Sequence, residues 1–317
     1  MIDLIIPAYN AHDTIEYALA SVATQLNVKD IRVTIVDDHC PKGCYDYLIP
    51  RFNQMVDIQL IRLDENCGPG VARQVGIDCT DRPYIMFLDS DDLLINVAGA
   101  KKLRAPLDND PNVYMSAAAF YEETPKGGVI EHVNDMVWVI AKMYRRCYLE
   151  KYGIRFNKTR ENEDTGFHTK MRAVAGNEEL AVFLKDFVGM WRYQPDSITR
   201  RNDCEYGFNK GFVGYIENKI DALTFPNVRE SYAREHSIGV LAECYRAYVN
   251  TRKLRPEFTK VVEEHSRLFW IVLAREAYYG DMERARLEIL KELRNNPPSA
   301  LPSVTFDQFL LMMEEFI

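Results

Sequence analysis

The first hundred residues alternate between short apolar runs of strand length and segments with helical apolar spacing, and this alternation limits the fold more than any other feature. Strands are expected at 3–9, 31–38, 57–63 and 84–89, and helices from about residue 13, over 45–55 and over 70–79. Strands joined by helices form right-handed crossovers, which place the strands parallel in one sheet with helices on both faces. The sequence therefore predicts an α/β fold with a mainly parallel central sheet.

The rest of the chain predicts a second part. At 317 residues the chain is longer than a single hydrophobic core usually becomes. Strand-like runs continue less regularly to about 205, and helical spacing then dominates. We expect a first domain over 1–205, divided into 1–100 and 101–205, and a C-terminal α-helical annex over 206–317. Apolar residues nearly encircle "SRLFWIVLAREAYYG" in the annex, so we expect this helix to be buried, with oligomerisation through the C-terminal helices as one possibility.

Composition excludes several functional classes. A formal net charge of -8 gives no overall footprint for nucleic acid, and no window approaches the roughly 18 apolar residues of a membrane span. Seven scattered cysteines favour a reducing compartment, and the Cys40/Cys44 pair lacks the second pair of a zinc site. The sequence predicts a cytoplasmic protein whose membrane association, if any, is peripheral.

Polar side chains follow the predicted strands. Asn10 follows the first strand, Asp37 and Asp38 end the second, and the segment "FLDSDDLLI" places Asp89, Asp91 and Asp92 at and just past the end of the fourth. The carboxyl ends of parallel strands meet at one sheet edge, where ligands bind. Clustered carboxylates suit Mg²⁺ or Mn²⁺, and Mg²⁺ usually shares its coordination with substrate phosphates. The expected ligand is a nucleoside diphosphate.

Three other interpretations of these residues stay open at this point. Asp91 or Asp92 would cap a helix that begins at "LLINVAGA". Asp89 would be the nucleophile of a phosphatase with a D-x-D-x-T/V motif, although Leu93 stands in the last position. Gly68 and Gly70 match part of a dinucleotide-binding G-x-G-x-x-G motif, in which Arg73 replaces the third glycine.

Four segments in order resemble the family 2 nucleotide-sugar glycosyltransferases: "IIPAYN", "VTIVDDHC", "ENCGPGVARQVGI" and "YIMFLDSDDLL". The resemblance covers about residues 2–100 and implies the GT-A fold, with a nucleotide-binding half over 1–100 and an acceptor-binding half over 101–205. It further implies a metal-dependent, inverting transfer of a sugar from a nucleoside-diphosphate donor, with UDP expected, to an acceptor hydroxyl. The acceptor, whether glycan, lipid-linked or nucleic acid, stays open.

The resemblance also implies roles for individual residues. The donor nucleotide would contact Pro7, Ala8, Tyr9, Asp37, Asp38, Gly68, Gly70, Arg73, Asp89 and Ser90. Mn²⁺ or Mg²⁺ would be bound by Asp89 with Asp91 or Asp92, the direct ligand of these two being undecided.

Later motifs match less closely. "ENEDTGF" resembles the family's Glu-Asp motif and implies that Asp164 is the general base, whereas without the resemblance it would be an acidic loop. "WRYQPDSITR" lacks the metal-binding His of many relatives, and Arg200 or Arg201 would contact the diphosphate. Trp138 and Trp191 are either acceptor platforms or core residues. The alternative function is a nucleotide-sugar-binding or scaffold protein without turnover.

Overall fold

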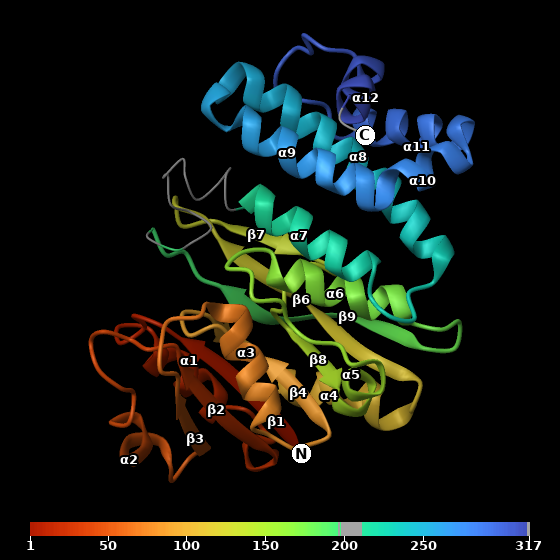
Figure 1. The fold of residues 1–317 in the computed structure, drawn as a ribbon. Coiled ribbons are helices and arrows are strands. Elements are labelled where there is room, and N and C mark those ends of the chain that lie inside the picture. The colour runs from red at the N-terminus through yellow and green to blue at the C-terminus, as the bar shows by residue number, and fades with distance from the viewer. Residues whose placement is uncertain (196, 198–210, 316–317) are drawn as a thin grey trace. The chain divides into compact units, whose positions relative to one another are not determined.

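The structure is a computed structural model of the chain, and it describes residues 1–195, 197 and 211–315. These residues form two compact units (Figure 1). The sheet unit contains the described residues of 1–160 and 175–200, and the helical unit contains those of 161–174 and 201–317. Each unit is described by itself.

The sheet unit is built on a nine-stranded sheet with the order β3-β2-β1-β4-β8-β6-β9-β5, and β7 pairs with β6. The first four neighbours are parallel, as is β6 with β9, whereas β8 is antiparallel to β4 and β6, and β5 is antiparallel to β9. In chain order the strands are β1 (Ile2–Ala8), β2 (Ile31–Asp37), β3 (Asp57–Arg62), β4 (Tyr84–Phe87), β5 (Leu93–Leu94), β6 (Val113–Glu123), β7 (Val129–His132), β8 (Lys142–Arg145) and β9 (Leu180–Trp191).

Helices cover both faces of the parallel part of this sheet. Leu4 and Ile6 pack with Ile15 of α1 in the main core, whereas Ile5 points to the other face and meets Gly76 of α3. The predicted mixed α/β fold is thereby confirmed. The helices of this unit are α1 (Ile15–Ala23), η1 (Val28–Asp30), α2 (Leu48–Phe52), α3 (Pro69–Asp78), α4 (Gly99–Asn109) and α5 (Arg146–Tyr152).

One alternative interpretation and one predicted helix length are wrong. The segment after the aspartates does not begin a helix, because Leu93 and Leu94 pair with Met190 and Gly189 of β9 and form β5. Neither Asp91 nor Asp92 therefore caps a helix there, and α4 begins only at Gly99. The second helix is also shorter than the predicted 45–55.

The helical unit has its own hydrophobic core, in which Leu241, Phe269, Trp270 and Phe309 are fully buried. Within the described ranges, no helix has both the length and the apolar character needed to cross a lipid bilayer. Its helices are α6 (Glu163–Val174), α7 (Gly211–Leu223), α8 (Glu230–Leu254), η3 (Pro256–Phe258), α9 (Thr259–Phe269), η4 (Trp270–Ala274), α10 (Arg275–Gly280), α11 (Met282–Asn295) and α12 (Phe306–Glu314).

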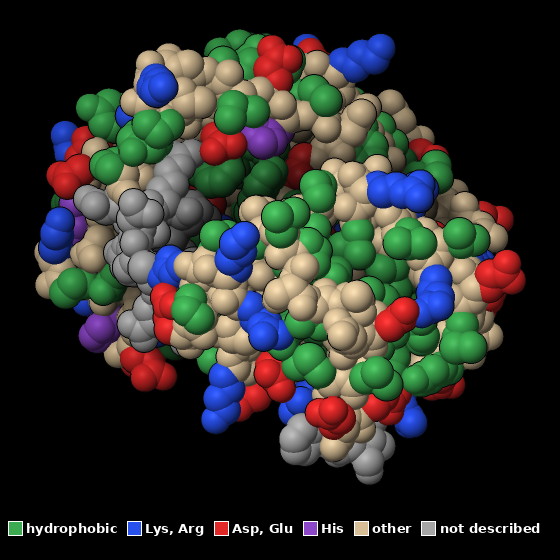
Figure 2. Space-filling model, turned by 90° about the horizontal axis from the view of Figure 1, so that it is seen from above, with side chains coloured by type: hydrophobic (Ala, Val, Ile, Leu, Met, Phe, Trp, Pro, Cys, Tyr) green, Lys and Arg blue, Asp and Glu red, His purple; other side chains and the backbone are tan. Residues whose placement is uncertain are grey.

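The apolar segment "SRLFWIVLAREAYYG" is only half buried in the chain. Phe269 and Trp270 lie in the core, but Ile271 is 51% exposed and Leu268 46%. Figure 2 shows hydrophobic side chains of this kind lying among charged ones at the surface. One side of this helix is therefore buried as expected, and burial of its other side against another subunit stays a prediction.

Candidate active site

The carboxyl ends of β1, β2 and β4 meet at one edge of the sheet, as the sequence predicts. Ala8 is aligned with Asp37 in the parallel register, and the N–H of Asp38 donates to the carbonyl of Ala8 at 2.9 Å. Pro7 and Ala8 are buried, whereas Tyr9 is 47% exposed. Of these three residues, Tyr9 offers a side chain to a ligand, and the other two offer backbone.

Asp38, at the end of β2, is hydrogen-bonded to loop 64–68, which precedes α3. Its Oδ1 accepts a hydrogen bond from the Cys67 N–H at 2.7 Å, and its Oδ2 accepts from the Gly68 N–H at 2.8 Å. The side-chain amide of Asn66 donates to the same Oδ2 at 3.1 Å. Burial raises the pKa of Asp38, and the N–H groups of Cys67 and Gly68 oppose this shift. The carboxylate therefore shapes the loop on which donor contacts are predicted.

Asp37 is completely buried and holds neighbouring chain segments together. Its Oδ2 forms an ion pair with Nη1 of Arg62 at 2.8 Å, and its Oδ1 accepts from the Cys40 N–H at 2.8 Å. These contacts support a structural role for Asp37, and donor binding by this residue stays a prediction.

Arg73 pairs with the first carboxylate of the acidic motif. Gly68, whose φ is 91°, precedes α3, Gly70 is buried in its first turn, and Arg73 follows one turn later. A positive φ of this size favours glycine. The Arg73 side chain is only 5% exposed, and its Nη2 lies 2.5 Å from Oδ1 of Asp89. The buried guanidinium thus compensates the charge of Asp89 and orients it.

The remaining residues of the acidic motif differ in exposure. Ser90 and Asp91 are partly exposed, whereas Asp92 is only 2% exposed. Oδ1 of Asp92 accepts from the N–H of Arg192, just after β9, at 3.0 Å. Asp92 therefore ties the motif to β9, and exposure favours Asp91 over Asp92 for contact with a ligand.

Protein groups already relieve much of the repulsion at this edge. Arginines pair with Asp37 and Asp89, and backbone N–H groups bind Asp38 and Asp92. In the described part of the chain no three His, Cys, Asp or Glu side chains gather as a metal site would require. The carboxylates at this edge fit a metal ion that is coordinated by one or two of them together with a diphosphate. They do not fit an ion held by protein groups alone.

The sequence analysis missed two residues that complete this loop. Arg160 donates from Nη1 to the Asn66 side-chain oxygen at 2.8 Å and from Nη2 to the Asn66 carbonyl at 2.9 Å. A Cβ on Gly68 would lie 3.6 Å from Cγ of Arg160. Nothing near Asn66 in the sequence indicates this contact, because Arg160 lies 94 residues away along the chain.

Asp164 lies in the first turn of α6, which belongs to the helical unit. The interpretation of "ENED" as an acidic loop is wrong at this point, because α6 begins at Glu163. Glu163 is 7% exposed, whereas Asp164 is partly exposed. Negative side chains are favourable in a first helical turn. The role of Asp164 as a general base stays a prediction. Arg200 and Arg201, predicted to contact the diphosphate, lie outside the described residues.

The two tryptophans lie at the margin of the core. The rings of Trp138 and Trp191 are 5.4 Å apart, and both side chains pack against the main hydrophobic cluster while partly exposed. This position is compatible with both roles considered for them.

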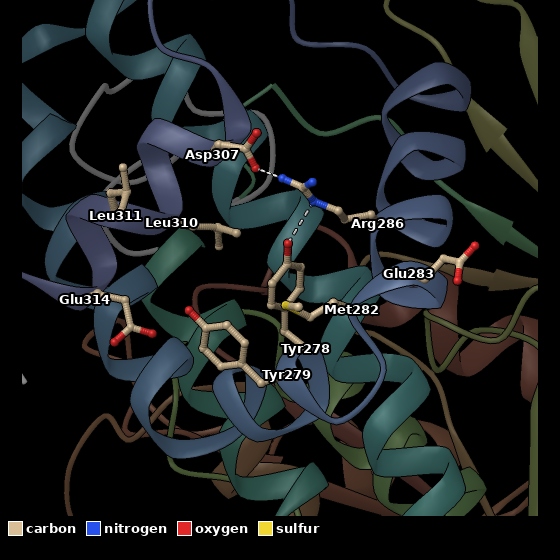
Figure 3. A pocket seen from close by; sticks show the side chains of 9 residues that line it. All are labelled: Tyr278, Tyr279, Met282, Glu283, Arg286, Asp307, Leu310, Leu311 and Glu314. Atoms are coloured by element: carbon tan, nitrogen blue, oxygen red, sulfur yellow. Dashed lines mark hydrogen bonds and ion pairs between the residues drawn. The ribbon is translucent and has the colours of Figure 1, made fainter.

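A separate cavity of about 610 Å³ lies within the helical unit, on α10, α11 and α12 (Figure 3). Tyr278, Met282 and Leu310 line it, and Arg286 donates from Nε to the Tyr278 hydroxyl at 3.1 Å and pairs with Asp307. None of the predicted donor-binding residues lies in it, so it is not the active-site candidate.

Comparison with known proteins places this architecture in a class. TarS residues 1–349 from S. aureus, solved in complex with UDP-GlcNAc, have the same GT-A fold with a TM-score of 0.68 at 16% identity, covering 92% of this chain and 89% of that one. The chain belongs to the family described as Glycosyl transferase family 2, whose model matches residues 3–174. This confirms the resemblance seen in the sequence.

Curated relatives are similar over parts of their length. A teichoic acid poly(glycerol phosphate) polymerase of Staphylococcus epidermidis is 34% identical over 250 residues, which are 72% of this chain and 34% of that protein. An uncharacterized glycosyltransferase of Haemophilus influenzae is 32% identical over 113 residues, which are 34% of this chain and 43% of that protein. The chain thus spans less than half the length of these two relatives.

Proposed function

We propose that the chain is a glycosyltransferase that moves a sugar from a nucleoside-diphosphate donor, with UDP as the nucleotide, to an acceptor hydroxyl with inversion at the anomeric carbon. The observation that carries this proposal is the arrangement at one edge of the sheet. There Asp38 binds loop 64–68, and Arg73 pairs with Asp89. The chain that holds this arrangement belongs to family 2. UDP is supported by the fold shared with the UDP-GlcNAc complex of TarS.

In this reaction the acceptor oxygen attacks the anomeric carbon opposite the departing nucleoside diphosphate. A bond from that oxygen to the carbon forms, the bond from the carbon to the diphosphate breaks, and the acceptor proton passes to a carboxylate, for which we propose Asp164. Loop 64–68 and Tyr9 bind the nucleotide. Arg73 holds Asp89 in place.

Asp89 and Asp91 are the residues that would hold Mn²⁺ or Mg²⁺, because Asp92 is buried against the Arg192 N–H. When bound, such an ion would offset the negative charge of the leaving diphosphate. Ser90 stays a proposed donor contact.

Donor class is tested by the melting temperature with UDP-, GDP-, CMP- and dTDP-sugars, each with and without Mn²⁺. A ligand that binds only the folded state raises this temperature. We expect the UDP-sugars alone to do so, and more with Mn²⁺. Stabilisation by none of the four classes contradicts the proposal, and stabilisation by another class corrects the nucleotide.

Catalysis is tested with Asp164→Asn, with Glu276→Gln at an exposed position of the same unit as the matched control. Asp164→Asn should keep donor affinity within about twofold and lose transfer by at least 100-fold, as expected for removal of a base. NMR of the product should show the inverted anomer. Donor binding without turnover in the native chain across an acceptor panel would favour the alternative, a nucleotide-sugar-binding or scaffold protein.

A further inference from the structure

In the helical unit, the end of α6, α7 and the start of α8 lie close together (Figure 1). Basic side chains from these three helices converge there. Nη2 of Arg229 donates to the carbonyl of Arg172 at 3.0 Å, and the guanidinium of Arg229 lies 5.5 Å from the centre of the Tyr232 ring. The His236 ring stacks on Tyr232 with centroids 3.7 Å apart. We call this group the cation cluster, and it consists of Arg172, Lys219, Arg229, Tyr232 and His236.

Lys219 carries a buried charge without a counterion. Lys219 is only 7% exposed, and its Nζ donates to Oγ1 of Thr169 at 3.0 Å. Among the described residues, no carboxylate forms an ion pair with Lys219, Arg172 or Arg229. Burial, and then Arg172, lower the pKa of Lys219 to about 8, so the ammonium is still mostly charged at pH 7. Burying an ion in this way is costly unless it is paired.

Tyr232 adds a buried donor that is also unsatisfied. Its hydroxyl is inaccessible to solvent and has no hydrogen-bond partner among the described residues. A buried hydroxyl in this state is destabilising, and such a group calls for an explanation. Its ring is fixed by Arg229 and His236, so the hydroxyl is positioned as well as unpaired.

Nearby carboxylates do not neutralise the cluster. Asp221 pairs with Lys170, and Glu235 is near enough to Tyr232 to raise the pKa of that phenol, although burial is the larger cause. Ammonium and guanidinium groups only donate hydrogen bonds. A ligand that satisfies these donors together must be anionic and must carry several acceptor oxygens.

We propose that the cation cluster is a binding site for a phosphomonoester or phosphodiester group. Such a group presents several anionic oxygens, and donors on three different helices converge on the cluster. The site is independent of the proposed sugar transfer: along α6, Arg172 is eight residues from Asp164, which is about 12 Å at the rise of an α-helix.

The first test compares the native chain with Lys219→Met in equal ionic strengths of inorganic phosphate and chloride. In phosphate we expect the native melting temperature to rise by a few degrees, and Lys219→Met to lose this rise. In chloride Lys219→Met should melt higher than the native chain, because it removes an uncompensated buried charge. Lys260→Met, whose side chain is 86% exposed in the native chain, should behave as the native protein. An equal phosphate effect in native and Lys219→Met protein, or no effect, overturns the proposal.

Tyr232→Phe gives a second test that leaves packing intact. In chloride this variant should melt higher than the native chain, because it removes an unsatisfied buried hydroxyl, and its affinity for phosphate should fall at least threefold. His236 reports occupancy: burial, with Arg172, Lys219 and Arg229, lowers its pKa to about 4, and a bound anion should raise it in an NMR titration. Unchanged phosphate affinity in Tyr232→Phe, together with an unchanged pKa of His236, contradicts the proposal.

The source of the phosphate group is distinguished by two probes. sn-Glycerol 3-phosphate represents a soluble ester, and phosphatidylcholine vesicles with or without phosphatidylglycerol represent a lipid headgroup. At least tenfold tighter binding by the native chain than by Lys219→Met identifies the source in either arm and supports the site. Equal binding by both proteins in both arms contradicts it.

Discussion

At the scale of single residues, the acidic edge of the sheet depends on partners that the protein itself supplies. Asp89 faces a nearly buried guanidinium, and the carboxylates of Asp38 and Asp92 accept backbone N–H groups. Charge clustering alone is therefore a weaker argument for a metal ion than the sequence suggested. The stronger argument is that Asp89 and Asp91 are more exposed than Asp92 and so are more accessible to a ligand.

The Arg73–Asp89 pair leads to a prediction about stability. Arg73→Met should lower the free energy of unfolding by roughly 1–3 kcal/mol, because it removes the partner of a carboxylate held by a buried cation. Asp89→Asn should also destabilise, and the double variant should lose less than the sum of the two, with a coupling energy of about 1–2 kcal/mol. Urea unfolding of the four proteins measures this coupling.

The pair formed by Arg155 and Asp78 provides the control for that cycle. It lies in the same unit, but its side chains are 57% and 42% exposed. Its coupling energy should be below about 1 kcal/mol, as is usual for exposed ion pairs. Equal coupling in both cycles would show that burial of Arg73 does not strengthen its pair.

At the scale of elements, α3, the helix that carries Arg73, packs closely on β1. A Cβ on Gly76 would lie 2.4 Å from Cγ2 of the buried Ile5, so Gly76→Ala must shift the Ile5 side chain, the helix or the strand. We expect a loss of about 1–3 kcal/mol in the free energy of unfolding. Weaker donor binding should accompany it, since Arg73 lies on this helix and Gly68 directly precedes it.

Gly239 supplies the matched control for this substitution. It is also a helical glycine, but a Cβ there would meet nothing within 4 Å. Gly239→Ala should stabilise by about 0.5–1 kcal/mol, because alanine favours a helix over glycine. A similar gain for Gly76→Ala, measured by urea unfolding, would contradict the close contact.

The elements also show how far sequence reasoning reaches. Alternating apolar runs placed β1 to β4 and α3 correctly, because strand and helix periodicity is local. The sequence did not predict β5, whose two residues pair with Met190 and Gly189. It placed the aspartates at one sheet edge but did not find Arg160, whose contact with Asn66 spans 94 positions. Contacts fixed only by the assembled fold leave no periodic pattern in the sequence.

At the scale of the whole molecule, the cation cluster should make stability depend on pH in an unusual direction. The pKa of Lys219 is about 8 in the folded chain and lies below the ordinary value of 10.5, so between these values the unfolded chain binds more protons. Stability then rises with pH. From pH 7 to 9 this group should add about 1 kcal/mol to the free energy of unfolding.

This rise in stability ends near pH 9, because the ionisation of other buried groups lowers the free energy of unfolding above that pH. Burial raises the pKa of the Cys244 thiol to about 12 from 9.0, so the unfolded chain begins to lose this proton first and stability falls with further increase in pH. Urea unfolding of the native chain and Lys219→Met at pH 7, 8 and 9, in chloride buffers, isolates the lysine. The difference between the two proteins should shrink by about 1 kcal/mol across this range. A constant difference would show that Lys219 keeps its ordinary pKa and is not buried as a charge, which would also remove the physical basis of the anion site.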